Sequence, residues 1–173
     1  MSEIVFVGVT TAASLIHRAM PLWQPLLPSP CALRGVDLPL DADDETYLTV
    51  LSDLRADGGA LGAVVTSHKV GIFRVGRAEF AHLDSEAIAC QEVNAIRRGS
   101  DGLAGWARDP VSVGRVVSRL WPDDEGVVVC LGAGGTGVAL TRHLAGLMGG
   151  ELLEPADLEL LATDAFMLGL YHV

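Results

Sequence analysis

The sequence is poor in basic residues, and this shortage limits the partners that the protein can bind. Lys and Arg together number 12 in 173 residues, against 22 Asp and Glu, which gives a formal net charge of -10 at pH 7. Nucleic acids are bound through clustered Lys and Arg side chains that neutralise backbone phosphates. We therefore expect no nucleic-acid partner.

Cysteine is also scarce. The three cysteines are Cys31, Cys90 and Cys130, an odd number with no CxxC pair and no His-rich spacing. An odd count without these patterns fits free thiols better than a disulfide framework or a structural zinc site. We expect free, buried thiols and no metal.

Long apolar segments are missing, although half of the residues are hydrophobic and the mean hydropathy is +0.38. This composition suffices for a sizeable core. The apolar runs at residues 3–9 (EIVFVGV) and 126–135 (GVVVCLGAGG) are far shorter than the roughly 20 residues of a transmembrane helix. No basic leader precedes a cleavage-like site. The sequence thus favours a globular, cytoplasmic protein without a membrane segment.

Short β-rich runs alternate with longer helical stretches, a pattern typical of an α/β fold. The pattern predicts strands at residues 3–9, 31–40, 61–67, 92–98, 103–109 and 127–131. It predicts helices at residues 10–27, 41–57, 70–80, 110–121 and 138–148. The strand at 31–40 resembles an edge strand, and Pro21 and Pro25 should bend or break the first helix. The polar segment DDEG at residues 123–126 separates a first domain, residues 1–121, from a second, residues 126–173.

The second domain begins with a strand, a glycine-rich turn and a helix. Gly132, Gly134 and Gly137 form a GxGxxG pattern, and Gly135 also lies in the turn. In a dinucleotide-binding turn the first glycine permits the tight bend, the second lets the backbone approach a pyrophosphate, and the third lets the helix pack on the strand. The N–H groups of the helix N-terminus can then hold phosphates. The strand and helix context favours nucleotide binding over an ordinary glycine turn.

The segment GAVVTSHKVGIF, residues 62–73, ends an apolar run on Lys69. An isolated lysine in such a place is usually a surface residue at the start of a helix. However, Asn94 and Asp109 also lie at the ends of apolar runs. If the strands are parallel and adjacent, these side chains meet at the edge where open α/β sheets bind ligands. A Lys and an Asp in a cleft can exchange a proton with a substrate oxygen.

Five segments follow the order and approximate spacing of shikimate dehydrogenase and its quinate dehydrogenase relatives. They are FVGVTTAASLIHRAM, GAVVTSHK, EVNAI, GLAGWARDP and VCLGAGGTGVA, and they span about residues 4–145. The chain resembles this family, which implies a three-layer α/β substrate-binding domain followed here by a short, incomplete Rossmann-like unit. It also implies an NAD(P)H-dependent oxidoreductase that reversibly reduces 3-dehydroshikimate to shikimate, or acts on a related cyclic hydroxy acid such as quinate.

The resemblance also assigns roles to single residues. Lys69 and Asp109 match the catalytic Lys and Asp of the family. Ser14, Thr66 and Asn94 match residues that bind the substrate, with Ser14 on its carboxylate. The cofactor-binding turn matches Gly132, Gly134, Gly135 and Gly137. The cofactor would be NADP or NAD, and the family resemblance favours NADP.

Several positions depart from the family pattern. Ile16 and His17 replace a Ser and a Pro, and Val64 replaces an Asn. The segment from Thr66 to Lys69 is one residue shorter than in the family, and Ala and Arg precede Asp109 where the family has Asn and Thr. The lost hydroxyl and amide would have oriented a substrate with many hydroxyls, and an unpaired group in a closed site costs about 1–3 kcal/mol.

Two histidines are candidates to replace the lost donors. These are His17 and His68, although a lone histidine is more often a surface or core residue. The substrate is therefore left open between shikimate and a related compound.

The second domain is short for a Rossmann domain. Glu154 lies about 20 residues after Gly132, near the place of an acidic ribose contact that would favour NAD, but an ordinary solvated Glu is the alternative. The apolar stretch at residues 158–171 would cover the first domain or a partner chain, as in a homodimer. Two functions remain open: the oxidoreductase, and a truncated or degenerate relative that binds a small molecule without hydride transfer.

Overall fold

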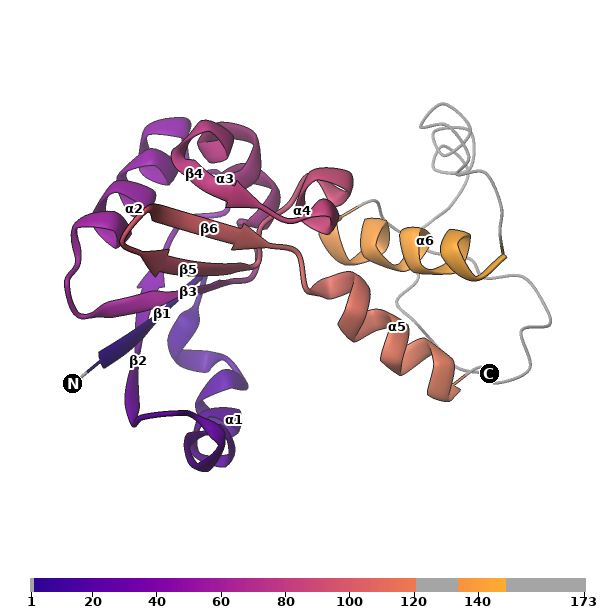
Figure 1. Ribbon diagram of the computed structural model, residues 1–173, viewed down its shortest axis with the longest axis horizontal. Coiled ribbons are helices and arrows are strands. Elements are labelled where there is room, and N and C mark those ends of the chain that lie inside the picture. Colours follow the sequence, from indigo (N-terminus) through magenta and orange to yellow (C-terminus); the bar gives the residue numbers. More distant parts are fainter. Residues whose placement is uncertain (1, 121–133, 149–173) are drawn as a thin grey trace. The chain divides into compact units, whose positions relative to one another are not determined.

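The computed structural model describes residues 2–120 and 134–148 (Figure 1). The chain divides into two compact units, Met1–Ala107 and Arg108–Val173. The domain division at residues 121–126, which the sequence predicts, stays a prediction because residues 121–133 lie outside the described part. The fold is α/β, as predicted: the first unit holds a six-stranded mixed sheet with helices.

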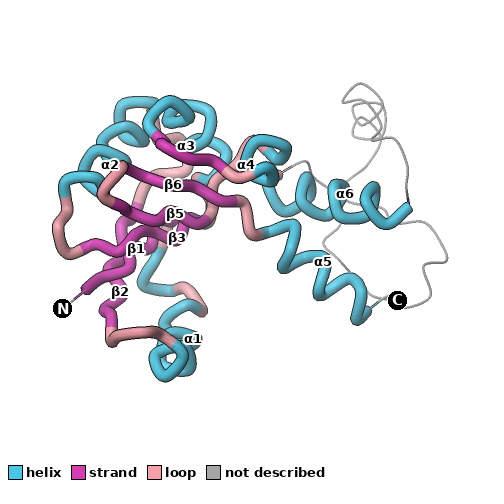
Figure 2. Tube along the Cα trace, viewed as in Figure 1, coloured by secondary structure: helices cyan, strands magenta, loops and turns pink. Residues whose placement is uncertain are grey.

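The elements of the first unit follow the predicted alternation (Figure 2). The strands are β1 (Ser2–Gly8), β2 (Cys31–Asp37), β3 (Ala60–Val65), β4 (Phe80–Leu83), β5 (Ala95–Gly99) and β6 (Gly102–Trp106). The α-helices are α1 (Ile16–Trp23), α2 (Asp44–Ala56), α3 (Lys69–Gly76) and α4 (Ser85–Cys90). Short 3-10 helices lie at η1 (Thr11–Ala13), η2 (Gln24–Leu26) and η3 (Arg77–Glu79).

The strand order is β2-β1-β3-β5-β6-β4. Strand β1 runs parallel to β2 and β3, whereas β5 runs antiparallel to both β3 and β6, and β4 is parallel to β6. Consequently β1, β3 and β6 end at the same edge of the sheet, and β5 begins there. Strand β2 lies at one end of the order, which confirms the predicted edge strand.

The local sequence of α2 explains where this helix begins and which of its side chains are buried. The carboxylate of Asp43 accepts a hydrogen bond from the N–H of Thr46 at 2.9 Å and so caps the first turn. Such a cap stabilises a helix by about 1 kcal/mol. Its apolar side chains Tyr47, Leu51 and Leu54 recur at helical spacing and are buried. They join the core with α3 and with every second residue of β1 and β3, including Val5 and Val65.

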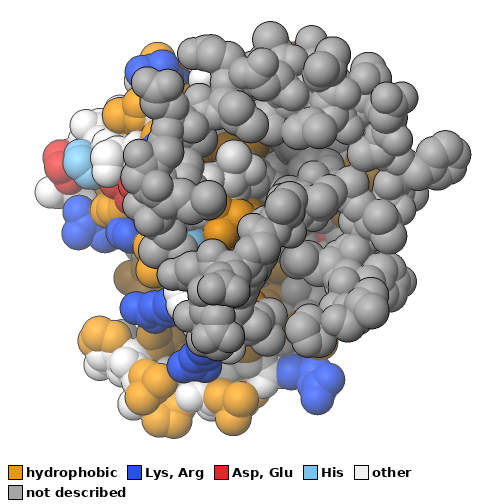
Figure 3. Space-filling view, turned by 90° about the vertical axis from the view of Figure 1, so that its right-hand side faces the viewer, with side chains coloured by type: hydrophobic (Ala, Val, Ile, Leu, Met, Phe, Trp, Pro, Cys, Tyr) orange, Lys and Arg blue, Asp and Glu red, His pale blue; other side chains and the backbone are white. Residues whose placement is uncertain are grey.

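The predicted helix at residues 10–27 is instead three pieces, η1, α1 and η2. Pro21 lies inside α1 and Pro25 inside η2, and proline removes a helical N–H donor. This segment leaves large hydrophobic side chains exposed: Leu15, Leu22, Trp23 and Leu26. In Figure 3 hydrophobic side chains gather at the lower end of the molecule, where Figure 1 places α1.

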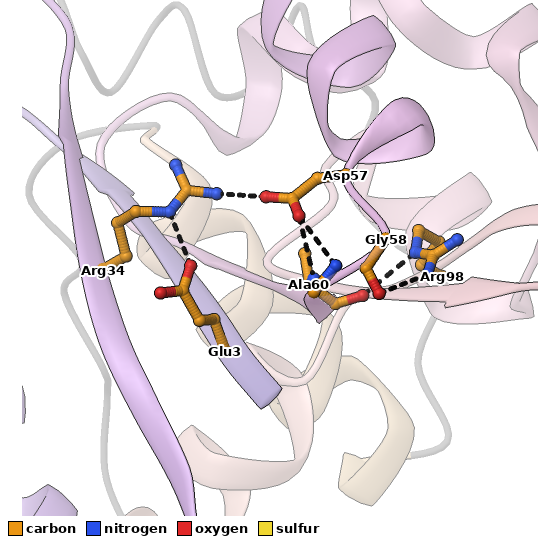
Figure 4. Close-up of polar contacts among 7 residues, drawn as sticks. Glu3, Arg34, Asp57, Gly58, Ala60 and Arg98 are labelled. Atoms are coloured by element: carbon orange, nitrogen blue, oxygen red, sulfur yellow. Dashed lines mark hydrogen bonds and ion pairs between the residues drawn. The ribbon is translucent and has the colours of Figure 1, made fainter. Parts of the chain in front are cut away.

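The edge of the sheet where β1 and β3 begin is held by polar contacts (Figure 4). Arg34 of β2 pairs with Glu3 of β1 at 2.8 Å and with Asp57, which precedes β3, at 2.6 Å. These contacts raise the pKa of Arg34, chiefly through the hydrogen bond to Glu3. Arg98 of β5 donates to two backbone carbonyls of the α2–β3 turn. All three ion-pair partners are partly exposed, so each pair stabilises the fold by no more than about 1 kcal/mol.

In the second unit the structure describes α5 (Asp109–Leu120) and α6 (Gly135–Met148), which contact each other. Gly114 of α5 lies against the ring of His143, where a Cβ would come within 2.5 Å of Cε1. The expected strand at 127–131, Glu154 and the apolar stretch at 158–171 lie outside the described residues. The homodimer expected from that stretch stays a prediction.

The cysteine prediction is confirmed for two residues. Cys31 and Cys90 are buried and free, whereas Cys130 lies outside the described part. Among the helices of residues 2–120 and 134–148, none is long and apolar enough to cross a membrane.

Candidate active site

Asn94 joins two strands at the edge where β1, β3 and β6 end. Its N–H donates to the carbonyl of Trp106 at 3.0 Å, and its carbonyl accepts from the N–H of Val65 at 2.9 Å. The residue is 7 % exposed. Because both backbone groups are bonded to neighbouring strands, the main chain of Asn94 is fixed by the sheet itself.

Thr66 lies at the same edge, directly after β3. Its N–H donates to the carbonyl of Val7 at 3.0 Å, and its hydroxyl donates to the same carbonyl at 3.3 Å. A Cβ on Gly8 would come within 2.9 Å of this hydroxyl, so glycine is what lets Thr66 approach the end of β1. Thr66 as a residue is exposed.

Lys69 begins α3, a short turn after β3. Its carbonyl accepts a hydrogen bond from the N–H of Val93 at 3.1 Å. Its side chain is 13 % exposed, and its Nζ atom lies 3.6 Å from Oε2 of Glu92. Of the predicted site residues, the structure therefore brings Thr66, Lys69 and Asn94 to one edge of the first unit.

Glu92 is a residue that the sequence reasoning did not single out. It is fully buried. Helix α4 ends before Gln91, whose left-handed conformation (φ 52°) turns the chain so that Glu92 enters the interior. Glutamate is almost never fully buried unless it is paired. No local pattern marks this burial, because Gln91 and Glu92 form an ordinary polar pair in the sequence.

Lys69 is also the single lysine of the sequence: every other basic residue among the 12 is an arginine. Arginine remains protonated at any physiological pH, whereas a lysine amine can lose its proton. The chain therefore has one basic side chain suited to proton transfer at the pH of a cell, apart from its histidines. This count is a second signal in the sequence that points to Lys69.

Ser14 lies between η1 and α1, in the segment that follows β1. Its Oγ atom accepts a hydrogen bond from the N–H of Ile16 at 3.3 Å. The same segment is tied to β2, because the N–H of Thr11 donates to Oδ1 of Asp37 at 2.7 Å. The hydrogen bonds from Thr11 lower the pKa of Asp37.

The two candidate histidines are held by protein groups. His68 is 2 % exposed; its Nε2 donates to the carbonyl of Leu38 at 3.2 Å, so its Nδ1 accepts from the hydroxyl of Tyr47 at 3.1 Å. Both ring nitrogens are thus occupied, and His68 does not serve as a substrate donor. His17 is exposed, and its Nε2 donates to the carbonyl of Thr11 at 3.1 Å.

Asp109 is the first residue of α5 and belongs to the second unit. A carboxylate is favourable there because the helix N-terminus carries partial positive charge. Its predicted partnership with Lys69 remains a prediction.

The glycine turn is described from Gly134 onward, and Gly132 lies outside the described residues. Helix α6 begins at Gly135, so Gly134, Gly135 and Gly137 form the helix start, and the N–H of Val138 donates to the carbonyl of Gly134 at 3.0 Å. A Cβ on Gly134 would meet none of the described atoms within 4 Å. The N–H groups at a helix N-terminus are of the kind that holds phosphates, and the dinucleotide site at these glycines remains a prediction.

The sequence matches no protein-family model and no curated protein. Solved structures do share its fold. Shikimate dehydrogenase 1 from Peptoclostridium difficile is 20% identical, with a TM-score of 0.70, over 87% of this chain and 52% of its own.

Two ligand-bound structures are also similar. Shikimate 5-dehydrogenase from Thermus thermophilus, in complex with NADP(H) and shikimate, is 23% identical, with a TM-score of 0.64, over 85% of this chain and 53% of its own. Quinate dehydrogenase from Corynebacterium glutamicum, in complex with NAD, is 18% identical, with a TM-score of 0.63, over 84% of this chain and 51% of its own.

The chain thus spans about half the length of the structures that it matches. At these identities the likeness concerns the fold. It confirms, at that level, the resemblance to shikimate and quinate dehydrogenases that the sequence motifs predict.

Proposed function

We propose that the chain is a shikimate dehydrogenase-like oxidoreductase, which reversibly reduces 3-dehydroshikimate to shikimate or acts on a related cyclic hydroxy acid such as quinate. The observation that carries this proposal is the position of Lys69. The one lysine of the chain lies at the edge where three strands end, beside Thr66 and Asn94. Open α/β sheets bind ligands at such edges.

In the proposed reaction Lys69 acts as the proton donor. When hydride reaches the carbonyl carbon of the substrate, negative charge develops on the ketone oxygen, and the Lys69 ammonium gives it a proton to form the hydroxyl. In the reverse direction the neutral amine accepts the hydroxyl proton as hydride leaves the carbon. Asp109 is proposed to orient the ammonium and the substrate hydroxyl.

The substrate would be held by polar side chains of the same edge and of the segment after β1. Asn94 and Thr66 offer an amide and a hydroxyl to the ring hydroxyls, and Ser14 offers a hydroxyl to the carboxylate. Because the Asn94 backbone is bonded to two strands, its main chain needs no ordering on binding, which reduces the entropic cost.

A nicotinamide cofactor would supply the hydride when bound. The start of α6, with Gly134, Gly135 and Gly137, would hold its pyrophosphate through backbone N–H groups, and Gly132 completes the predicted turn. Both NADP and NAD occur with the similar folds. We propose NADP first, because the sequence resemblance favours it.

A second candidate is a binding module that takes up the same class of small molecule without hydride transfer. Val64 supports it, because this half-buried apolar residue of β3 stands where the family has an amide. His68 does not replace that amide, since Tyr47 and Leu38 occupy its ring nitrogens.

The two candidates are separated by measuring reduction of NADP and of NAD by the full chain with shikimate or quinate. The oxidoreductase gives formation of reduced nicotinamide that requires both partners. The binding module gives saturable binding of the hydroxy acid by calorimetry with no reduction of either cofactor.

A further inference from the structure

Lys69 lies beside a carboxylate that the sequence did not predict. This carboxylate is Glu92, whereas the predicted acidic partner is Asp109. The Glu92 side chain is completely inaccessible to solvent, and its Oε2 atom lies 3.6 Å from Nζ of Lys69. Moving a carboxylate out of water is costly unless an opposite charge and hydrogen bonds compensate it. A buried glutamate must therefore either take up a proton or lie beside a cation, and the only lysine of the chain is at that distance.

The backbone fixes this pair from both sides. The N–H of Val93 donates to the carbonyl of Lys69 at 3.1 Å, which joins the start of α3 to the residue after Glu92. The N–H of Glu92 donates to the carbonyl of Ala87 at 3.2 Å, which joins it to α4. Glu92 and Lys69 thus come from separate elements whose ends are hydrogen-bonded, and their side chains meet without a mobile loop between them.

The segment that contains Glu92 also contains Asn94, which is proposed to contact the substrate. Asn94 lies two residues after Glu92 and is bonded to β3 and β6. One short segment, residues 92–94, therefore supplies the carboxylate beside Lys69 and the amide proposed to bind substrate.

We propose that Glu92 is a positioning residue: a buried counter-ion that holds Lys69 in its ammonium form and fixes its location at the sheet edge. The catalytic consequence rests on the proposed function. After Lys69 gives its proton to the ketone oxygen, the neutral amine lies beside the Glu92 carboxylate, which favours uptake of a proton from solvent and restores the ammonium. Glu92 itself exchanges no proton with substrate.

Other titratable side chains lie on the elements around the pair and are left unchanged in the test. In the first unit they are Tyr47 of α2, His68 before α3, Arg77 and Glu79 of η3, and Asp84, Glu86 and Cys90 of the α4 region. Tyr47 and His68 are hydrogen-bonded to each other.

The single lysine makes a direct experiment possible. Biosynthetic labelling with [13Cε]lysine gives the full chain one signal, and its chemical shift against pH reports the protonation of Lys69. In Glu92→Gln, which keeps the shape and removes the charge, we expect a titration midpoint lower than that of the wild type. Glu79→Gln is the matched control, because it removes an equal charge from an ion pair with Arg55; its midpoint should equal that of the wild type.

An unchanged midpoint in folded Glu92→Gln would overturn the proposal, whether or not the chain reduces a nicotinamide. If this variant does not fold, [13C]glutamate labelling of the wild type replaces it. The Glu92 carboxyl signal should then be that of a carboxylate at pH 7 and should shift where Lys69 loses its proton. A carboxyl signal typical of the protonated acid at pH 7, or one with no shift at the Lys69 midpoint, would overturn it equally.

If the chain is an active dehydrogenase, the pH profile of kcat should move with the same midpoint in Glu92→Gln. An inactive wild type whose Lys69 midpoint still depends on Glu92 would contradict the proposed function alone. Failure of the proposed role of Glu92 can therefore be distinguished from failure of the proposed function.

Discussion

The N–H of Val93 donates a hydrogen bond to the carbonyl of Lys69 across 3.1 Å, and so joins the start of α3 to the segment that carries Asn94. A lysine and an amide that are well separated in the sequence thereby share one edge of the sheet. The proposed chemistry depends on this connection, because a proton donor must lie within reach of the oxygen that the amide helps to position.

Lys69→Met should abolish most of the dehydrogenase activity. A proton donor contributes about 100-fold to 10,000-fold to turnover, so kcat should fall by at least about 100-fold while KM changes little. Arg74→Met is the control, since Arg74 lies on the same helix, is exposed and pairs with Asp44. Equal kcat values in wild type and Lys69→Met would contradict the catalytic role.

Ser14→Ala should raise KM for the hydroxy acid by about 10-fold and leave kcat nearly unchanged. A hydrogen bond to a carboxylate that is made equally in ground and transition states affects binding only. Ser100→Ala, in the exposed turn between β5 and β6, serves as the control and should alter neither parameter. A parallel loss of kcat would argue against simple anchoring of the carboxylate.

The Tyr47–His68 pair should contribute to stability rather than to binding. Tyr47→Phe removes the donor to His68 Nδ1 and leaves that buried nitrogen unpaired, which should lower the free energy of unfolding by about 1–2 kcal/mol. His68→Ala also leaves the carbonyl of Leu38 without its donor and should cost about 2–4 kcal/mol. Urea unfolding of both single variants and the double variant measures their coupling. Additive losses would show that the hydrogen bond contributes nothing.

Acid should weaken the fold through Asp37. Hydrogen bonds from Thr11 lower its pKa below the usual 3.8, so the folded state favours the carboxylate. This contribution is fully present above pH 3.8 and is lost as the pH falls through the folded-state pKa. In Asp37→Asn the urea midpoint should depend less steeply on pH below about 4 than in the wild type. Identical pH dependence in the two proteins would rule out this contribution.

Gln91→Gly should stabilise the protein. Gln91 is exposed and has a φ of 52°, a conformation that glycine adopts without the cost borne by a residue with a Cβ. The free energy of unfolding should rise by about 0.5–1 kcal/mol. Gln91→Ala, which keeps the Cβ, should give no gain, and a gain of equal size in Ala would show that the left-handed backbone is not the cause.

The sequence predicts the elements that have a strong hydrophobic period. Strands β1 and β3, the edge position of β2, and the strands within residues 92–98 and 103–109 all follow from apolar runs and turns. Strand β4 and helix α4 were not predicted, because four and six residues are too few to show a period. The break of the first helix was expected from its prolines, but its division into three pieces depends on local hydrogen bonds such as that from Ser14 to Thr11.

Only part of the candidate site is predictable, because some of its residues depend on contacts between distant parts of the chain. Lys69 and Asn94 could be singled out because each follows an apolar run, and runs that end together place such residues at one edge. Thr66 was assigned through the family resemblance. Glu92 could not be singled out, because its burial depends on the reversal at Gln91 and on packing against Lys69. The structural role of His68 could not be predicted either, because its hydrogen-bond partners Tyr47 and Leu38 are distant in sequence.

The most direct test is to add shikimate to the [13Cε]lysine-labelled chain and follow its one signal, first alone and then with NADP. A ligand that binds beside Lys69 should shift this signal saturably, and Asn94→Ala should weaken the binding by about 10-fold. Titration of Arg74→Met provides the control for a change of charge on α3. A Lys69 signal that does not move at saturating shikimate, with or without NADP, would contradict a substrate site at this edge of the sheet.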